Sequence, residues 1–261
     1  MATVDVVLPV YNEESVIAQS VATLLEWFDG HPEHEWRVVV ANNASTDRTL
    51  AIARTLSEQH PGRVAALDVP AKGKGLALRI AWLTSPADVN AYMDVDLSTD
   101  IEHLPELVDP IAAGDVDVTY GTRLDPRSQT TRQLFREVVG RGYVFVFQTL
   151  LGLRVTDAQC GFKAMSRDAT REILPLVLHT HWFWDTEMLM VAQENRYRMR
   201  AVPVKWIEDT DSSVAVVDTA LDDLRGIWRL RTGGVPRVSR GAARWPERDG
   251  DGEPPGDRAI P

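Results

Sequence analysis

The sequence is poor in several features that would otherwise assign its class at once. It has one cysteine among 261 residues, so no disulfide can form within the chain, and we expect a reducing compartment, by default the cytoplasm. It also has no excess of positive charge, since the formal net charge is -10. A general nucleic-acid binder needs clustered lysine and arginine, so we expect no nucleic-acid partner.

Long hydrophobic runs and a secretory leader are absent as well. Residues 1–14 enter a strand pattern directly, without a basic segment followed by an apolar one. The longest apolar stretch, 143–153, is too short to span a bilayer. It ends an expected helix at 132–151 in which three arginines precede it, an arrangement that suits either a membrane surface or a core helix with a charged outer face.

The first half of the chain alternates apolar strand-length runs with amphipathic helix-length segments. Strands that are apolar throughout and joined by helical crossovers indicate a mostly parallel sheet with helices on both faces, and therefore an α/β fold. The expected strands are 4–10, 37–42, 64–69, 88–95 and 116–122, and the expected helices between them are 14–28, 48–59, 74–84 and 101–112.

Beyond Arg123 this alternation stops. We expect a polar loop at 125–131, helices at 132–151, 168–178, 185–194 and 214–231, and a strand at 199–204. From Gly233 onward the chain is rich in proline, glycine and balanced charge, with almost no apolar periodicity. We therefore predict one domain over residues 1–232 and a disordered tail over 233–261.

Polar segments follow four of the expected strands, at 11–14, 42–47, 94–100 and 121–123. In open α/β sheets ligands bind outside the carboxyl ends of the strands, so these segments are the candidate site. Helix capping is the ordinary alternative, and we expect it for Ser45, Thr46 and Thr99.

Capping does not explain Asp94 and Asp96, which end an otherwise apolar strand. If the strand runs to residue 96, their side chains share one face. Two carboxylates within about 5 Å repel unless a cation lies between them or one takes a proton. A hard divalent ion with oxygen ligands removes that conflict, so the pair predicts a metal and phosphate site. The alternative is one capping and one solvated aspartate.

Six segments of the sequence carry a resemblance to a known family: VVLPVYNEE, NNASTDRT, KGKGLALRIAW, YMDVDLSTD, YGTR and DAQCGFKAM. They occur in the order seen in family 2 glycosyltransferases. The resemblance is strongest to the dolichol-phosphate mannosyltransferase and polyprenyl-phosphate glycosyltransferase branch and covers roughly residues 3–232. It implies a GT-A (Rossmann-like) fold and an inverting hexosyltransferase that moves a hexose from a nucleotide diphosphate sugar, of the GDP-mannose or UDP-glucose type, to a polyprenyl or dolichyl phosphate with Mg²⁺ or Mn²⁺.

The resemblance also implies roles for individual residues. In the donor half, Asp94 would contact the nucleotide sugar and Asp96 would bind the metal. Ser98 stands where many relatives have glutamine and would reach the metal through water at best. The common DDGSTD segment reads NNASTD here, which leaves the identity of the base open. The nucleotide-binding residues would be Pro9, Tyr11, Glu13, Asn43 and Lys72, with Lys74 adding positive potential.

In the acceptor half, Arg123 and Lys163 would bind phosphate and Glu187 would help hold the acceptor loop. Arg123 directly follows a buried strand, where a guanidinium suits bidentate binding of phosphate oxygens better than packing. Asp157 could face the acceptor, as a positioning group first and a base second. The alternative for this segment is a structural salt bridge between Asp157 and a nearby arginine. The predicted catalytic set is therefore Asp94, Asp96, Arg123 and Asp157.

Two other enzyme classes share parts of this pattern. A haloacid-dehalogenase hydrolase is disfavoured because its D-x-D motif follows the first strand, and a sugar nucleotidyltransferase because it has a glycine-rich loop where this chain has YNEE. A catalytically inactive nucleotide-sugar-binding scaffold and a family 2 enzyme with a non-lipid acceptor stay as alternatives. A lipid acceptor requires contact with the cytoplasmic face of a membrane, through this chain as a peripheral protein or through a separate membrane partner.

Two further groups of side chains complete the expectations. We expect Cys160 to be a small packed thiol, because no histidine or aspartate pattern around it suggests a nucleophile. We expect Trp182, Phe183 and Trp184 to lie in the core, with the lining of an acceptor groove as the alternative.

Overall fold

The computed structural model describes residues 1–131, 152–207 and 216–238. The expected helix at 132–151 and most of the expected tail lie outside these ranges. The last described helix ends at Gly233, and the domain limit at residue 232 stays a prediction.

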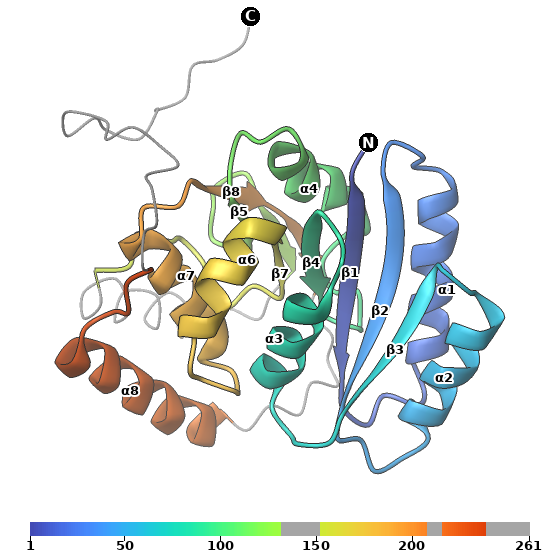
Figure 1. The fold of residues 1–261 in the computed structure, drawn as a ribbon, viewed down its shortest axis with the longest axis horizontal. Helices are drawn as coiled ribbons and strands as arrows, with labels where there is room; N and C mark the ends of the chain where they lie inside the picture. The colour runs from blue at the N-terminus through green and yellow to red at the C-terminus, as the bar shows by residue number, and fades with distance from the viewer. Residues whose placement is uncertain (132–151, 208–215, 239–261) are drawn as a thin grey trace, which may run out of the picture.

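A seven-stranded sheet forms the centre of the fold, in the order β3-β2-β1-β4-β7-β5-β8 (Figure 1). Every strand is parallel to its neighbours except β7, which pairs antiparallel with β4 and β5. The expected mostly parallel sheet is therefore confirmed. The strands are β1 Thr3–Val10, β2 Glu35–Asn43, β3 Val64–Val69, β4 Val89–Met93, β5 Val118–Thr122, β7 Phe162–Ser166 and β8 Met199–Pro203.

Helices cover both faces of this sheet and give the molecule two cores. Val6 and Leu8 of β1 belong to one core and Val7 to the other, because successive side chains of a strand point to opposite faces. This two-sided burial explains why the strands are apolar throughout. One face carries α1 Ile17–Asp29, α2 Thr49–Gln59 and α4 Leu104–Ala112, and the other carries α3 Lys74–Thr84, α6 Arg167–Ile173, α7 Trp184–Glu194 and α8 Val216–Gly233.

Three strands were not expected from the sequence. β7 carries Lys163 at its second position, and a lysine inside a short run is not typical of a central strand. The other two, β6 Gln129–Thr131 and β9 Lys205–Ile207, pair in a separate two-stranded sheet and fall partly in the expected polar loop. Each has only three residues, too few to show a period.

The start of α4 differs from the expected capping pattern. The 3-10 turn η1, Ile101–His103, precedes α4, and the Asp100 side chain caps it by accepting a hydrogen bond from the Glu102 N–H at 3.2 Å. Thr99 is instead buried and forms an isolated bridge with Trp206. The capping prediction for Thr99 is therefore wrong, and the neighbouring carboxylate performs that task.

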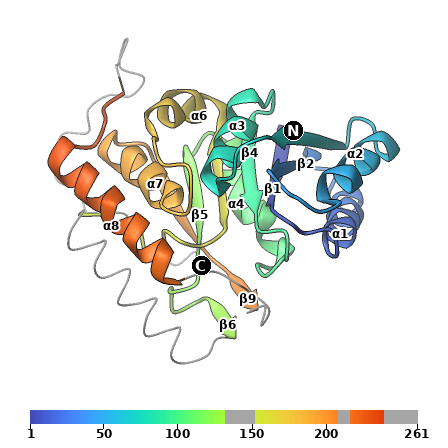
Figure 2. The ribbon, with the colours of Figure 1, turned by 90° about the horizontal axis from the view of Figure 1, so that it is seen from below.

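The carboxyl ends of β1 and of its parallel neighbours meet at one edge of the sheet, at the bottom of Figure 1. Figure 2 looks onto this edge from below and shows α8 running beside α7. Among the described residues, every helix is too short or too polar to cross a bilayer.

Candidate active site

Two loops at the carboxyl edge are joined to each other by side-chain hydrogen bonds. Residues 11–16 follow β1 and residues 44–48 follow β2. The bonds run from Thr46 N to Asn12 Oδ1 (2.8 Å), Asn12 N to Ser45 Oγ (3.0 Å), Glu13 N to Thr49 Oγ1 (2.8 Å) and Glu14 N to Asp47 Oδ2 (3.2 Å). The first N–H of helix α2, that of Thr49, donates to Asp47 Oδ1 at 2.9 Å and not to Ser45 or Thr46, so the capping prediction for these two residues is wrong. These polar residues instead fix the two loops as one rigid unit.

The predicted nucleotide-binding residues of β1 lie at this unit. Pro9 is half-buried in β1 opposite Ala41 of β2, and Tyr11 follows the strand. The exposed Lys72 places its Nζ 3.8 Å from the centre of the Tyr11 ring, within the range of a cation–π interaction. The structure thus brings Tyr11 and Lys72 together, with the ammonium near the end of β1.

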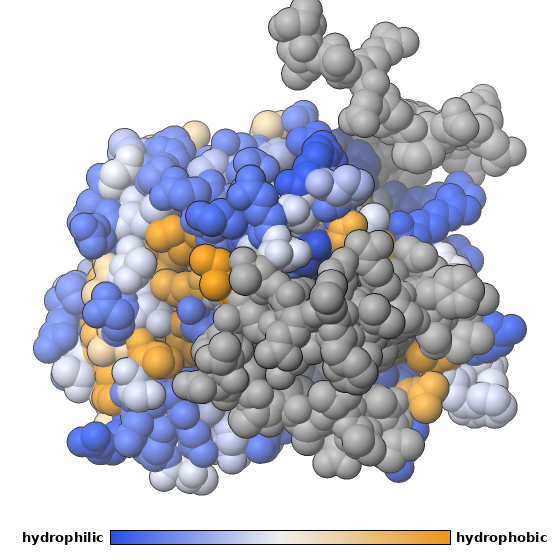
Figure 3. Space-filling model, turned by 180° about the vertical axis from the view of Figure 1, so that it is seen from behind, coloured by the Kyte–Doolittle hydropathy of each residue, from blue (hydrophilic) through white to orange (hydrophobic). Residues whose placement is uncertain are grey.

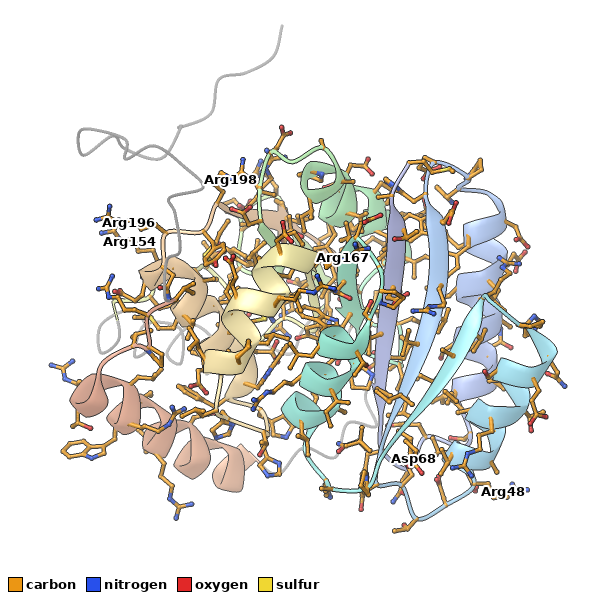
Figure 4. The ribbon with its side chains drawn as sticks, viewed as in Figure 1. Arg48, Asp68, Arg154, Arg167, Arg196 and Arg198 are labelled. Atoms are coloured by element: carbon orange, nitrogen blue, oxygen red, sulfur yellow. The ribbon has the colours of Figure 1, made fainter. Side chains whose placement is uncertain are left out.

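The two asparagines that end β2 have different partners. Asn43 is buried, and its Oδ1 accepts a hydrogen bond from the Gly73 N–H at 2.5 Å, which fixes the segment before α3. Asn42 donates its Nδ2 to Asp68 Oδ1 at 3.0 Å, at the lower edge where Figure 4 labels Asp68. An aspartate at position 42 would have no proton for that carboxylate and would repel it. Asp68 therefore accounts physically for one departure from the common DD pair.

Asp94 is held between an ammonium group and a glycine. Lys74 Nζ lies 2.7 Å from Asp94 Oδ1, and the two side chains are 13% and 42% exposed. On the other side, a Cβ added to Gly161 would lie only 1.8 Å from Asp94 Oδ2. The carboxylate therefore occupies the space that any larger residue at 161 would need, which gives the glycine of DAQCGFK a specific structural reason.

Asp96 lies beyond the end of β4 and is exposed. Because β4 ends at Met93, the two aspartates belong to a turn and do not share a strand face. In this turn Leu97 has a left-handed backbone with a φ of 51°. The Ser98 N–H donates a hydrogen bond to Asp96 Oδ1 at 2.9 Å and closes the turn. One carboxylate oxygen of Asp96 takes no part in that bond, so Asp96 can face a ligand at the carboxyl edge.

The donor set suits a divalent cation that is bound together with phosphate. Within the described ranges no cluster of three or more histidine, cysteine, aspartate or glutamate side chains could hold a metal by itself. Mg²⁺ is commonly bound by one or two carboxylates plus substrate phosphate oxygens and water, and Asp94 and Asp96 supply such a pair. Ser98 is half-buried beside them, and its proposed metal role stays a prediction.

Lys74 is the charged centre of this edge. Burial by itself lowers the pKa of the Lys74 ammonium, but the nearby charge of Asp94, followed by that of Asp185, raises the pKa above its ordinary value. Lys74 therefore keeps its positive charge. The sequence placed Lys72 and Lys74 together as a source of positive potential, and the structure singles out Lys74 as the one against the Asp94 carboxylate.

Arg123 and Asp157 form a buried bidentate pair. Arg123 Nε lies 2.8 Å from Asp157 Oδ2 and Nη2 lies 3.0 Å from Oδ1, while the Arg123 N–H also donates to Oδ2 at 3.1 Å. Burial alone raises the pKa of the Asp157 carboxyl, but the charge and hydrogen bonds of Arg123 bring it below its ordinary value. This is the salt bridge that the sequence left open as the alternative. It favours positioning over a base role for Asp157.

Lys163 is enclosed in the core rather than open to the edge. Its side chain is 0% exposed, and Nζ lies 2.8 Å from Asp185 and donates to the Cys160 carbonyl and the Tyr92 hydroxyl. The Tyr92 hydroxyl also donates to Asp185. Burial, followed by the charge of Asp185, raises the pKa of Tyr92 well above its usual value, so Tyr92 stays neutral. An acceptor-phosphate role for Lys163 would require it to leave Asp185, and that role stays a prediction.

Cys160 beside this network is a packed thiol, as expected. Its side chain is buried, and burial raises the pKa of the thiol to about 11. The group is therefore protonated at neutral pH and is a poor nucleophile.

Glu187 holds the loop at 178–183 that precedes α7. Its side chain is 0% exposed, with Oε2 accepting the His179 N–H at 2.8 Å and Oε1 lying 2.8 Å from Arg229 of α8. Glu187 therefore fixes this loop against α8, and its predicted role in holding an acceptor stays a prediction. Sequence reasoning did not identify Arg229 as the partner, because the two residues are far apart in the chain.

The same loop brings Trp182 to the site. Phe183 and Trp184 are fully buried as expected, but Trp182 is 38% exposed and its ring centre lies 4.8 Å from Lys74 Nζ. Close backbone approach fixes the loop there, since a Cβ added to Gly73 would lie 2.5 Å from the Thr180 carbonyl oxygen. Trp182 thus follows the alternative, a lining position, while its two neighbours form core.

Comparisons with known proteins agree with this architecture. The family model described as "Glycosyl transferase family 2" matches residues 5–174. Glycosyltransferase AglD of Haloferax volcanii is 35% identical over 242 residues, which cover 91% of this chain and 38% of AglD. Dolichyl-phosphate beta-glucosyltransferase ALG5C of Trichomonas vaginalis is 30% identical over 247 residues, which cover 86% of this chain and 73% of the relative. The chain spans less than two fifths of the length of AglD.

Solved structures confirm the fold class. Glucosyl-3-phosphoglycerate synthase from Mycobacterium tuberculosis, in complex with uridine diphosphate, superposes with a TM-score of 0.64 at 20% identity and covers 90% of this chain and 81% of that one. The same enzyme with Mn²⁺, UDP-glucose and phosphoglyceric acid gives a TM-score of 0.63 at 19% identity. At this identity the likeness concerns the fold alone, which is the expected GT-A fold.

Proposed function

Since this chain belongs to glycosyl transferase family 2, we propose that it is an inverting hexosyltransferase that moves a hexose from a nucleotide diphosphate sugar to a polyprenyl or dolichyl phosphate. The observation that carries the proposal is the carboxyl edge itself, where Lys74, Asp94 and the exposed Asp96 lie together at the ends of the parallel strands. Relatives named dolichyl-phosphate beta-glucosyltransferases support the lipid acceptor.

The charges at this edge fit the departure of a nucleotide diphosphate. Negative charge develops on the diphosphate as the sugar leaves, and fixed positive groups stabilise it. A Mg²⁺ or Mn²⁺ ion bound through Asp96 and Asp94 would supply Lewis-acid neutralisation of that charge. Lys74 keeps its proton beside Asp94 and adds a second positive group, while Tyr11 and Lys72 border the place where the nucleotide enters.

The acceptor half needs orientation more than proton transfer. A phosphate monoester is already an anion at neutral pH, so no base has to remove a proton from it. Asp157 fits this requirement, because its pair with Arg123 keeps the carboxylate ionised and engaged in hydrogen bonds. We assign Asp157 to the orientation of Arg123, whose side chain is 15% exposed and would meet an acceptor phosphate.

UDP-glucose is the donor to test first, with GDP-mannose as the second. The relatives are named as glucosyltransferases, and the superposed enzyme was solved with UDP and UDP-glucose. Both statements concern those proteins, so donor choice is part of the proposal. The isoprenoid acceptor would place this chain at the cytoplasmic face of a membrane, as a peripheral protein or beside a membrane partner.

An inactive scaffold is the competing function, motivated by the altered NNAS segment. Asn42 donates a hydrogen bond to Asp68, and Asn43 accepts one from the backbone before α3. Both asparagines therefore have a structural role, and neither replaces Asp94 or Asp96. The segment therefore no longer argues for loss of activity.

The test is transfer of labelled hexose from UDP-glucose or GDP-mannose to a short polyprenyl phosphate in the presence of Mn²⁺ or Mg²⁺. We expect lipid-linked product with one donor, and its loss in Asp96→Asn but not in Asp115→Asn, an exposed aspartate on the loop after α4. Nucleotide-sugar binding without product for either donor would favour the scaffold. Product formed equally well by Asp96→Asn would remove the metal assignment.

A further inference from the structure

Large exposed hydrophobic side chains gather on two segments that pack together. Of the eight such side chains in the described part of the chain, four lie on the loop at 178–183 or on α8. Leu178 and Trp182 are 58% and 38% exposed, and Leu224 and Trp228 are 52% and 71% exposed. We call these four residues the α8 surface. Such a concentration indicates an interaction site, because scattered single residues would be the ordinary pattern.

The sequence of α8 separates an inner from an outer face. Ile227 and Leu230 are 5% and 3% exposed and pack into the core. Leu224 and Trp228 lie four residues apart on the outer face, with the exposed Arg225 beside them. An apolar stripe with tryptophan and arginine at its border is the composition of a helix that lies in a membrane interface.

The inner face is fixed to the loop that carries Trp182. A Cβ added to Gly226 would lie 2.3 Å from the Phe183 ring, so the helix touches that ring directly. Arg229 lies 2.8 Å from Glu187, whose other oxygen accepts the His179 N–H. These contacts pack the helix against the loop, so the two segments that carry the four exposed side chains are joined.

This surface reaches the candidate active site. Trp182 lies over Lys74, and the Leu76 N–H of α3 donates to the Thr180 carbonyl at 2.9 Å. Figures 1 and 2 show α8 on the same lower side of the molecule as the carboxyl ends of β1 and β2. Viewed from behind, the larger hydrophobic area lies on the left of Figure 3, away from α8, and a smaller one lies at the lower right, on the side of α8.

We propose that the α8 surface is the face on which this protein lies against a lipid bilayer, with Leu224 and Trp228 inserted among the headgroups. The choice of a bilayer over a protein partner rests on the proposed function, since an isoprenoid acceptor must keep its chain in the membrane while its phosphate reaches the carboxyl edge of the sheet. Docked in this way, Trp182 lies between the membrane and the Lys74 ammonium. Arg225 meets anionic headgroups, so binding increases with anionic lipid.

The experiment is co-sedimentation of the full chain with vesicles of phosphatidylcholine and with vesicles that also contain phosphatidylglycerol. The test variant is Leu224→Asn with Trp228→Asn, at exposed positions outside the catalytic site. The control is Leu83→Asn on α3, also an exposed leucine, at 37% exposure. We expect the double variant to lower the partition coefficient at least about tenfold, because it removes two apolar side chains from the membrane interface, and Leu83→Asn to leave it unchanged.

Activity assays separate this inference from the proposed function. We expect the double variant to keep transfer to a short, water-soluble isoprenyl phosphate and to lose transfer to a long-chain acceptor in vesicles. Vesicle binding that depends on Leu224 and Trp228, without transfer to any acceptor, would support the docking surface and reject the proposed function. Equal vesicle binding by wild type and double variant would overturn the inference, as would a wild-type dimer that the double variant converts to monomer.

Discussion

Replacing Gly161 by alanine tests the arrangement around Asp94 more sharply than removal of the carboxylate does. The added Cβ would lie 1.8 Å from Asp94 Oδ2, 2.4 Å from Cγ and 2.7 Å from Oδ1. Unstrained contacts between such atoms lie at about 3.5 Å, so the carboxylate has to move by more than 1 Å. Such a movement disturbs its 2.7 Å contact with Lys74.

The magnitude follows from the kind of clash. Forcing an extra methyl group into a well-packed place costs about 1 to 3 kcal/mol of unfolding free energy, and we expect the lower end of this range because the Asp94 side chain is 42% exposed. In an Asp94→Ala background the opposing carboxylate is gone, so the same Gly161→Ala change should cost less than about 0.5 kcal/mol. Urea unfolding of the four proteins of this cycle measures both values, and Gly233→Ala, where a Cβ meets nothing within 4 Å, is the control.

A coupling energy near zero would refute the reasoning. If Gly161→Ala destabilised the Asp94→Ala protein as much as the wild type, the clash would lie elsewhere. The single Gly161→Ala protein should also bind UDP in Mn²⁺ more weakly than wild type, because its Asp94 is displaced. Unchanged nucleotide binding would separate Asp94 from the donor site.

Three further predictions concern the surrounding structure. Asp157→Ala leaves the buried Arg123 guanidinium without its partner and should lower the free energy of unfolding by about 3 to 5 kcal/mol in urea titrations; a loss below about 1 kcal/mol would contradict the buried pair. Burial raises the pKa of Asp223 to about 7 from an unfolded value of about 3.9, so the folded state holds a proton that the unfolded state releases, and stability should fall as the pH rises from about 4 to 7. Asp223→Asn should flatten that slope, and an unchanged slope would assign it to another group. Gly226→Ala should push α8 off the Phe183 ring, and faster amide exchange in α8 at unchanged exchange in β1 would show this.

The fold was predictable where local sequence and burial agree. The predicted bounds of β3, 64–69, and of α3, 74–84, are those of the structure. In both segments the hydrophobic pattern of the sequence continues without interruption from the first residue to the last. β7 was missed because its Lys163 looks like a surface residue until Asp185, 22 positions along the chain, supplies the buried partner. Long-range pairing of charges leaves no trace in a local pattern.

In the candidate site, too, local features were predictable from the sequence and long-range contacts were not. The polar strand ends and the two aspartates of the turn were visible in the sequence, and the structure places Tyr11, Lys72, Lys74 and Asp94 at one edge. The pair of Arg123 with Asp157 was foreseen only as an alternative. The contact of Trp182 with Lys74 depends on Gly73 and Gly75, which let the loop at 178–183 approach α3. A periodic pattern of apolar residues does not indicate such a close approach.

Calorimetric titration of UDP into the wild-type protein tests the central claim most directly. We propose that donor binding at this edge requires a divalent cation held by Asp94 and Asp96. We predict that UDP binds in Mn²⁺, that EDTA weakens binding at least about tenfold, and that Asp96→Asn shows the weak affinity in both conditions. Equal UDP affinity with Mn²⁺ and with EDTA, or a wild-type response in Asp96→Asn, would contradict the account.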